Sequence, residues 1–131
     1  MKTALTLIAA LATAYPALAG PYDQPYAMVE SGNRSGVRKE LPTHIGSIDG
    51  ESTSRHRRSH VVAPGKRQVE IYLPTRVAPT AKRYRVVEID ATACVRYRIV
   101  ARYDNLTHIE WTPVVYSEPI GECSRKFKRA G

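Results

Sequence analysis

The sequence predicts an all-β domain, a small β-sandwich or open barrel of about six to seven short antiparallel strands that follows an N-terminal signal peptide. Short runs of apolar and polar residues, many of them alternating, recur beyond residue 42 at intervals of about 8–12 residues. Turn residues such as Asp49-Gly50 and Pro64-Gly65 separate these runs. After residue 20, apolar residues nowhere recur at helical spacing over three turns.

The N-terminal residues 1–19 have the three parts of a secretory signal. Lys2 supplies the positive charge, an uncharged Ala/Leu-rich run follows, and Ala17-Leu18-Ala19 places small residues at a cleavage point. The apolar run is shorter than the roughly 20 residues that a transmembrane helix needs. The alternative, a buried N-terminal helix, would make the charge and the small residues coincidental. We therefore expect cleavage after Ala19 and a periplasmic or secreted mature protein with no transmembrane segment.

The mature chain of 131 − 19 = 112 residues has the length of one domain. We expect an irregular leader at residues 20–41, a β-sandwich domain at 42–124 and a basic tail at 125–131. Within the leader, the apolar island at residues 26–29 could form an edge strand.

Six runs in the expected sandwich have the character of strands. They are residues 43–48, 60–63, 68–73, 84–89, 95–103 and 109–116. The clearest is 95–103, in which Val95, Tyr97, Ile99, Ala101 and Tyr103 share one face. In the last run, Pro113 indicates an edge position or a bulge, and Trp111 is expected to anchor the core.

The two cysteines of the chain, Cys94 and Cys123, both lie in the mature part. In an oxidising compartment an isolated pair is most simply a disulfide, and closing a loop of this length is worth about 3–4 kcal/mol. A metal pair or a redox dithiol would favour Cys-X-X-Cys spacing and, for a metal, further ligands nearby. The disulfide is therefore expected to close the domain.

The mature chain is basic: the formal net charge of +8 becomes +7 without Lys2. Such a protein would be drawn to an anionic envelope polymer or an acidic envelope protein, and export makes nucleic acid an unexpected physiological partner. Arginine suits bidentate contact with phosphate and carboxylate. The candidate anion-binding residues are Arg96, Arg98 and Arg102 on one strand face, and Arg55, Arg57 and Arg58 in one expected loop. The alternative of equal weight is a solvated surface that only keeps the protein soluble.

No catalytic, cofactor or metal motif is recognisable. His56 and His60 are four residues apart, which aligns metal ligands only on a helix, and here Arg57 and Arg58 lie between them in an expected loop. The chain has no Gly-X-Ser-X-Gly motif. We therefore expect a non-enzymatic binding domain without a cofactor; the alternative is an extracytoplasmic enzyme or enzyme inhibitor whose site the sequence does not reveal.

Two parts of the chain are similar to known exported proteins. Ile48-Asp49-Gly50-Glu51 and the run Pro64-Gly65-Lys66-Arg67-Gln68-Val69-Glu70-Ile71 resemble the first hairpins of the PEGA-type surface-layer domain, a small β-sandwich module of exported bacterial proteins. The charged insert at residues 55–58 departs from that pattern. The second half, with Cys94-Val95-Arg96-Tyr97, Trp111-Thr112-Pro113-Val114-Val115 and Glu118-Pro119-Ile120-Gly121-Glu122-Cys123, is similar to short exported proteins of Gram-negative bacteria. The resemblance implies a fold and a location, and it implies no reaction.

Overall fold

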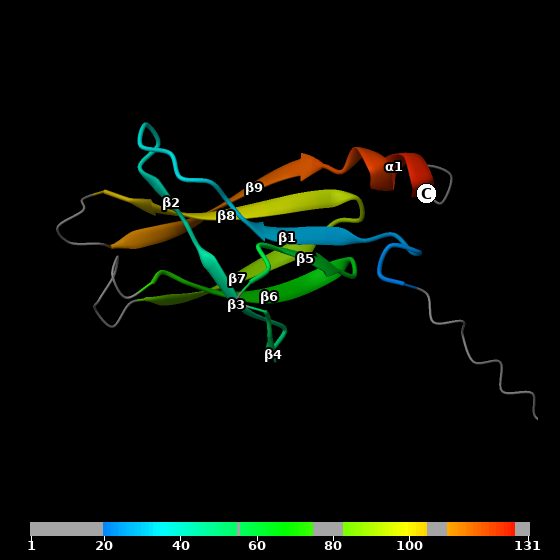
Figure 1. Ribbon diagram of the computed structural model, residues 1–131, viewed down its shortest axis with the longest axis horizontal. Helices are drawn as coiled ribbons and strands as arrows, with labels where there is room; N and C mark the ends of the chain where they lie inside the picture. Colours follow the sequence, from blue (N-terminus) through cyan, green and yellow to red (C-terminus); the bar gives the residue numbers. More distant parts are fainter. Residues whose placement is uncertain (1–19, 55, 75–82, 105–109, 128–131) are drawn as a thin grey trace, which may run out of the picture.

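The computed structural model describes residues 20–54, 56–74, 83–104 and 110–127, so the expected signal peptide lies outside the described residues. Two β-sheets lie one above the other, and a short helix follows the last strand (Figure 1). The first sheet holds β1 (Ala27–Ser31), β2 (Glu40–Pro42), β5 (Ser59–Val62), β8 (Val95–Tyr103) and β9 (Trp111–Pro119). The second holds β3 (His44–Ile48), β4 (Glu51–Ser52), β6 (Gly65–Tyr72) and β7 (Tyr84–Ala91). The predicted all-β sandwich class is confirmed.

The main hydrophobic core lies between the sheets, because its buried residues come from the inner faces of both. The first sheet contributes Ala27, Val29, Leu41, Ile99, Ala101, Tyr103 and Trp111, and the second Ile45, Val69, Ile71, Ile89 and Ala91. The inward face predicted for residues 95–103 is confirmed at Ile99, Ala101 and Tyr103, which are buried, but Val100 on the arginine face is buried as well. Trp111 is 3% exposed, as the prediction of a core anchor requires.

The region expected to be an irregular leader contains a central strand, so that expectation is wrong for β1. This strand pairs with β5 on one edge and with β8 on the other, and Ala27 and Val29 are fully buried. Its pairing with β8 is parallel, whereas the sequence predicted antiparallel strands throughout. After β1 the chain separates from β8. It then returns to the same strand as β2, which pairs antiparallel with the second half of β8.

Gly32 lies where β1 separates from β8. Its amide donates a hydrogen bond to the Ile99 carbonyl at 3.0 Å. A Cβ atom at this position would collide with the side chain of Val100, so only glycine fits the close approach.

The Asp49-Gly50 hairpin is confirmed, since Ile48 pairs with Glu51 and the two residues between them have φ of 52° and 83°. Two positive φ values are what a type I′ turn requires. The Pro64-Gly65 turn has a different role from a hairpin: β5 and β6 belong to different sheets, so the chain crosses the sandwich there. Strand β9 pairs with β8 alone among the described strands, which agrees with the edge position predicted from Pro113.

The predicted disulfide between Cys94 and Cys123 is present and joins the start of β8 to helix α1 (Gly121–Phe127). The sequence did not predict this helix, because two turns are too short for a recognisable periodicity. Ile120 and Cys123 pack with Tyr26 in a second, smaller hydrophobic cluster. The helix also takes up the start of the expected basic tail, whose last residues, 128–131, lie outside the described chain.

Candidate functional site

The three arginines of β8 lie on the outer face of the first sheet, opposite the core-facing residues of the same strand. Each is paired with a carboxylate. Arg98 Nε contacts Glu30 Oε1 at 2.6 Å, and Arg96 Nη1 contacts Glu118 Oε1 at 3.0 Å. The register explains these pairs, because Glu30 lies opposite Arg98 and Glu118 lies opposite Arg96 in the neighbouring strands.

The third arginine of the row is part of a small polar network. Tyr116 donates a hydrogen bond to Glu40 Oε1 at 2.7 Å, and Arg102 Nη2 donates one to the Tyr116 hydroxyl at 3.1 Å. The guanidinium of Arg102 lies 3.7 Å from the carboxylate of Glu40, which is 2% exposed. A buried carboxylate needs such partners.

The acidic partners leave little uncompensated charge on this face. Partial burial acts to raise the pKa of Glu30, but hydrogen bonds from Arg98 and Ser59 and the charges of Arg96 and Arg98 bring the pKa below its ordinary value of 4.5. Glu30 is therefore ionised at neutral pH and neutralises part of the row. The arginine row of β8 is a network of ion pairs, and sequence reasoning missed its acidic half.

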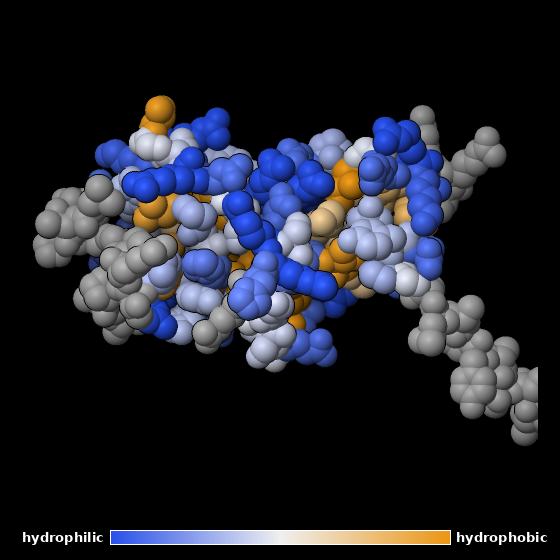
Figure 2. Space-filling model, viewed as in Figure 1, coloured by the Kyte–Doolittle hydropathy of each residue, from blue (hydrophilic) through white to orange (hydrophobic). Residues whose placement is uncertain are grey.

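The arginines of the loop before β5 have a different environment. Arg55 lies outside the described residues, whereas Arg57 and Arg58 line a cavity of about 390 Å³. We call this cavity the arginine pocket; it is lined by Ser31, Asn33, Arg34, Pro42, Thr43, His44, Ile45, Ser54, Arg57, Arg58 and Tyr72. No carboxylate is among these residues. Figure 2 shows strongly hydrophilic side chains in the middle of the face of the molecule that is viewed in Figure 1, where β2 leads into β3.

Neutral acceptors orient Arg58 in the arginine pocket. Its Nη2 donates to the Gly32 carbonyl at 3.3 Å and to Asn33 Oδ1 at 3.2 Å. Within the described part of the chain, the side chains of Arg34 and Arg57 make no hydrogen bond or ion pair. Three arginines therefore line a cavity whose described walls contain no carboxylate.

One wall of the arginine pocket is aromatic. His44 and Tyr72 lie opposite each other in β3 and β6, and their rings stack with centroids 5.3 Å apart. Tyr84 of β7 continues the row, 5.5 Å from Tyr72. Sequence reasoning missed Arg34, His44 and Tyr72 as site residues, because they lie in three separate segments that only the sandwich brings together.

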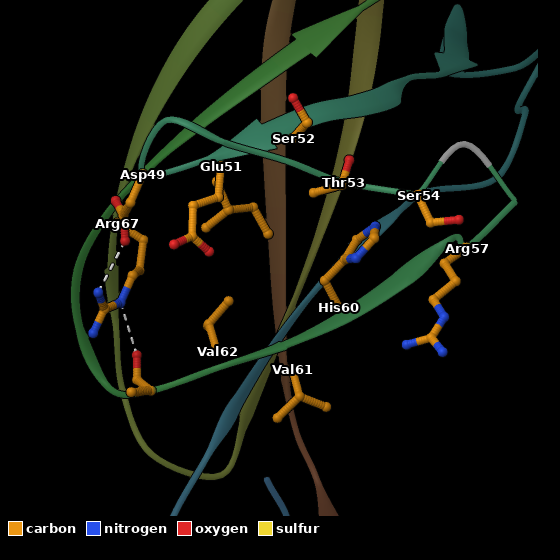
Figure 3. Close-up of a pocket in the computed structure, with 12 residues that line it drawn as sticks. Asp49, Glu51, Ser52, Thr53, Ser54, Arg57, His60, Val61, Val62 and Arg67 are labelled. Carbon is orange, nitrogen blue, oxygen red and sulfur yellow. Dashed lines mark hydrogen bonds and ion pairs between the residues drawn. The ribbon is translucent and has the colours of Figure 1, made fainter.

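A larger cavity of about 630 Å³ lies on the other side of Arg57 and carries charges of both signs (Figure 3). Arg67 and Asp49 form an ion pair at 2.9 Å within its lining. Nε2 of His60 is buried there without a hydrogen-bond partner. Among the described residues no hydroxyl is hydrogen-bonded to this nitrogen.

The partly buried ring of His60 makes stability depend on pH. Burial lowers the pKa of His60 below its ordinary value of 6.5, the charge of Arg57 lowers it further, and a backbone contact with Arg57 opposes the shift. Below about pH 6.5 the unfolded chain therefore binds more protons than the folded protein. The stabilising contribution is complete above that value and is lost as the pH falls through it towards the lowered folded pKa.

We expect urea denaturation between about pH 5 and 8 to show a free energy of unfolding that decreases towards acid in this window. His60→Gln should flatten that slope, because glutamine does not titrate. Glu30 cannot produce the same slope, since its stabilising ionisation is lost only as the pH falls below 4.5. An identical slope in the variant would show that another group is responsible.

Two further features bear on the class of site. Among the described residues, no group of three or more His, Cys, Asp or Glu side chains is placed to hold a metal ion, and His56 and His60 form no such group. No helix in the described ranges is long and apolar enough to cross a membrane.

Comparison of the chain with protein families, curated proteins and solved structures finds no match. A function for this protein must therefore follow from the chemistry of its own side chains. The arginine pocket is the site where that chemistry is most specific.

Proposed function

We propose that this protein is a non-enzymatic domain that works outside the cytoplasm and binds an anionic component of the cell envelope through the arginine pocket. One observation carries the proposal: Arg34, Arg57 and Arg58 line a single cavity, and none of the described residues in its walls is a carboxylate. Guanidinium groups bind phosphate and carboxylate in a planar, bidentate geometry. The disulfide between Cys94 and Cys123 supports a location in an oxidising compartment.

For the same reason we prefer the arginine pocket to the arginine row of β8 as the anion-binding site. On β8, binding an external anion would compete with Glu30 and Glu118 for the guanidinium groups of Arg96 and Arg98. In the arginine pocket, the hydrogen bonds of Arg58 go only to neutral oxygens. An incoming anion therefore displaces no acidic partner there, and we place the binding site in this pocket.

The proposal predicts that methyl phosphate and acetate bind in the arginine pocket of the mature protein. In a ¹H–¹⁵N NMR titration, with chloride at matched ionic strength as the reference, the amides of residues 31–34, 43–45, 54 and 56–58 should shift. Arg34→Gln combined with Arg57→Gln should weaken binding by about tenfold or more, since a hydrogen bond to a charged group contributes about 1.5–3 kcal/mol. Binding should also weaken as salt rises, because exposed charges are screened.

The matched control combines Lys66→Gln with Arg125→Gln. It removes the same charge from two exposed positions outside the pocket, so it should bind both anions as the wild type does. Equal losses in the two double variants would mean that net charge alone attracts the anion. Absence of any shift in the pocket amides would refute the pocket as the site. Retention of the wild type, and loss of the pocket variant, on purified anionic envelope polymer would extend the result to the physiological ligand class.

A further inference from the structure

Two further cavities adjoin the arginine pocket. A smaller cavity of about 220 Å³ is lined by Glu30, Ser31, Asn33, Arg58 and Arg98. It shares Ser31, Asn33 and Arg58 with the arginine pocket. The guanidinium of Arg58 therefore lies between the two cavities and can contact a ligand in either.

A third cavity, of about 520 Å³, adjoins the arginine pocket on its aromatic side and shares Ile45 and Tyr72 with it. Tyr84 and Arg83 also line this cavity, and the Arg83 guanidinium lies 4.9 Å from the centre of the Tyr84 ring. Tyr84 is 49% exposed. The three cavities therefore follow one another across the molecule, with the arginine pocket in the middle.

The charges differ between the middle and the ends of this series. In the smaller cavity, Arg98 is already paired with Glu30 at 2.6 Å. The third cavity contains Glu70 as well as Arg83. Paired or mixed charges offer both donors and acceptors, which suits hydroxyl groups, whereas the unbalanced arginines in the middle suit an anion.

The flanking carboxylates distinguish two kinds of anionic polymer. The His44 and Tyr72 rings stack with centroids 5.3 Å apart, and the exposed Tyr84 ring lies tilted to Tyr72 at 5.5 Å. Such rings can contact either a nucleic-acid base or the C–H groups of a sugar. The neighbouring phosphates of a nucleic acid, however, would meet Glu30 and Glu70 in the two flanking cavities, whereas uncharged sugar hydroxyls can bond to these carboxylates.

We infer that the ligand is an acidic polysaccharide: one acidic sugar residue occupies the arginine pocket, and neighbouring hydroxyl-rich residues occupy the two flanking cavities. This inference rests on the proposed function and adds to it the chemical class and the extended shape of the ligand. Binding neighbouring units of one chain makes the later contacts intramolecular, so affinity should rise with chain length until all three cavities are filled.

The test is calorimetric titration of the mature protein with glucuronic acid and with hyaluronan oligosaccharides of increasing length, in which uncharged N-acetylglucosamine residues flank each glucuronic acid. We expect the affinity per chain to rise by about tenfold or more from the monomer to the trimer and to change little beyond the length that fills the cavities. Arg83→Gln combined with Tyr84→Ala should bring the ratio of trimer affinity to monomer affinity down towards one. Arg34→Gln combined with Arg57→Gln should weaken every member of the series. Far-UV circular dichroism and melting curves verify that each variant is folded.

The outcomes separate the two proposals. If the monomer binds in the pocket but affinity does not rise with length, the extended polysaccharide is refuted and the anion site stands. If neither the monomer nor methyl phosphate shifts the pocket amides, the proposed function itself fails. If oligothymidylate of equal charge binds at least as tightly as the hyaluronan oligosaccharides, the ligand class is nucleic acid and the inference is overturned. Weaker binding of oligothymidylate supports the polysaccharide.

Discussion

Replacing Trp111 with alanine is expected to lower the free energy of unfolding by about 3–5 kcal/mol, because it removes the largest side chain of the core and leaves a cavity. Trp111 is 3% exposed and begins β9 opposite Tyr103. The guanidinium of Arg85 lies 5.0 Å from the centre of its ring, on the side of the second sheet. The residue therefore joins the two sheets at one end of the sandwich.

Urea denaturation of wild type and variant measures this loss. Trp111→Phe is the matched control, since it retains an aromatic ring and should cost clearly less. Trp111 is also the only tryptophan of the chain, so its fluorescence reports its surroundings in the wild type directly. Red-shifted emission that acrylamide quenches freely would contradict the buried position.

Replacing Cys123 with serine is expected to lower the free energy of unfolding by about 2–5 kcal/mol, as for other native disulfides of small secreted domains. The bond closes a loop with a sequence separation of 29 residues and attaches α1 to the start of β8. Without it, the helix is held by the small cluster around Tyr26 and by Lys126, whose ammonium donates to the Tyr22 carbonyl at 2.8 Å. The C-terminal segment should consequently be the first part of the chain to detach.

Thermal melting of the oxidised wild type and of the variant measures the effect. Cys94→Ser and the double variant serve as controls and should melt close to Cys123→Ser, because each lacks the same bond. Dithiothreitol should bring the wild type towards the same temperature. Modification of both cysteines by a thiol reagent in the native protein would show that the bond is absent, and an unchanged melting temperature in the variant would show that it does not stabilise the fold.

The anion-binding and chain-length experiments are independent of these two stability tests. Arg34 and Arg57 make no side-chain hydrogen bond or ion pair within the described residues, so their replacement should leave the melting curve nearly unchanged. Loss of binding without loss of stability is the expected signature of a surface that exists for a ligand.

Local chemistry was enough to predict several features from the sequence alone. The Asp49-Gly50 hairpin follows from the positive φ values that these two residue types tolerate. The two faces of β8 follow from the alternation of Arg96, Arg98 and Arg102 with apolar residues, because successive side chains of a strand point to opposite sides. Pro113 predicted an edge strand because proline lacks the amide that a second neighbour would need.

Other features were decided by contacts between distant segments. The short run at Ala27–Ser31 gave no sign of a central strand; it became one through its pairing with β5 and β8. Glu30 and Arg98, 68 residues apart, meet because of that same pairing. A single strand's pattern specifies which way an arginine points, but its electrostatic partner is set by the neighbouring strand.

The candidate site most clearly separates what the sequence determines from what contacts between distant segments determine. The sequence alone determined that the chain is basic and that arginines are grouped in two places. Only the tertiary structure decided which group carries unbalanced charge: β1, β2 and β9 bring carboxylates to the arginines of β8, whereas the turn after β1 adds Arg34 to Arg57 and Arg58. The physical reason is that the field at a site is the sum over all nearby charges, and which charges are near is a property of the fold.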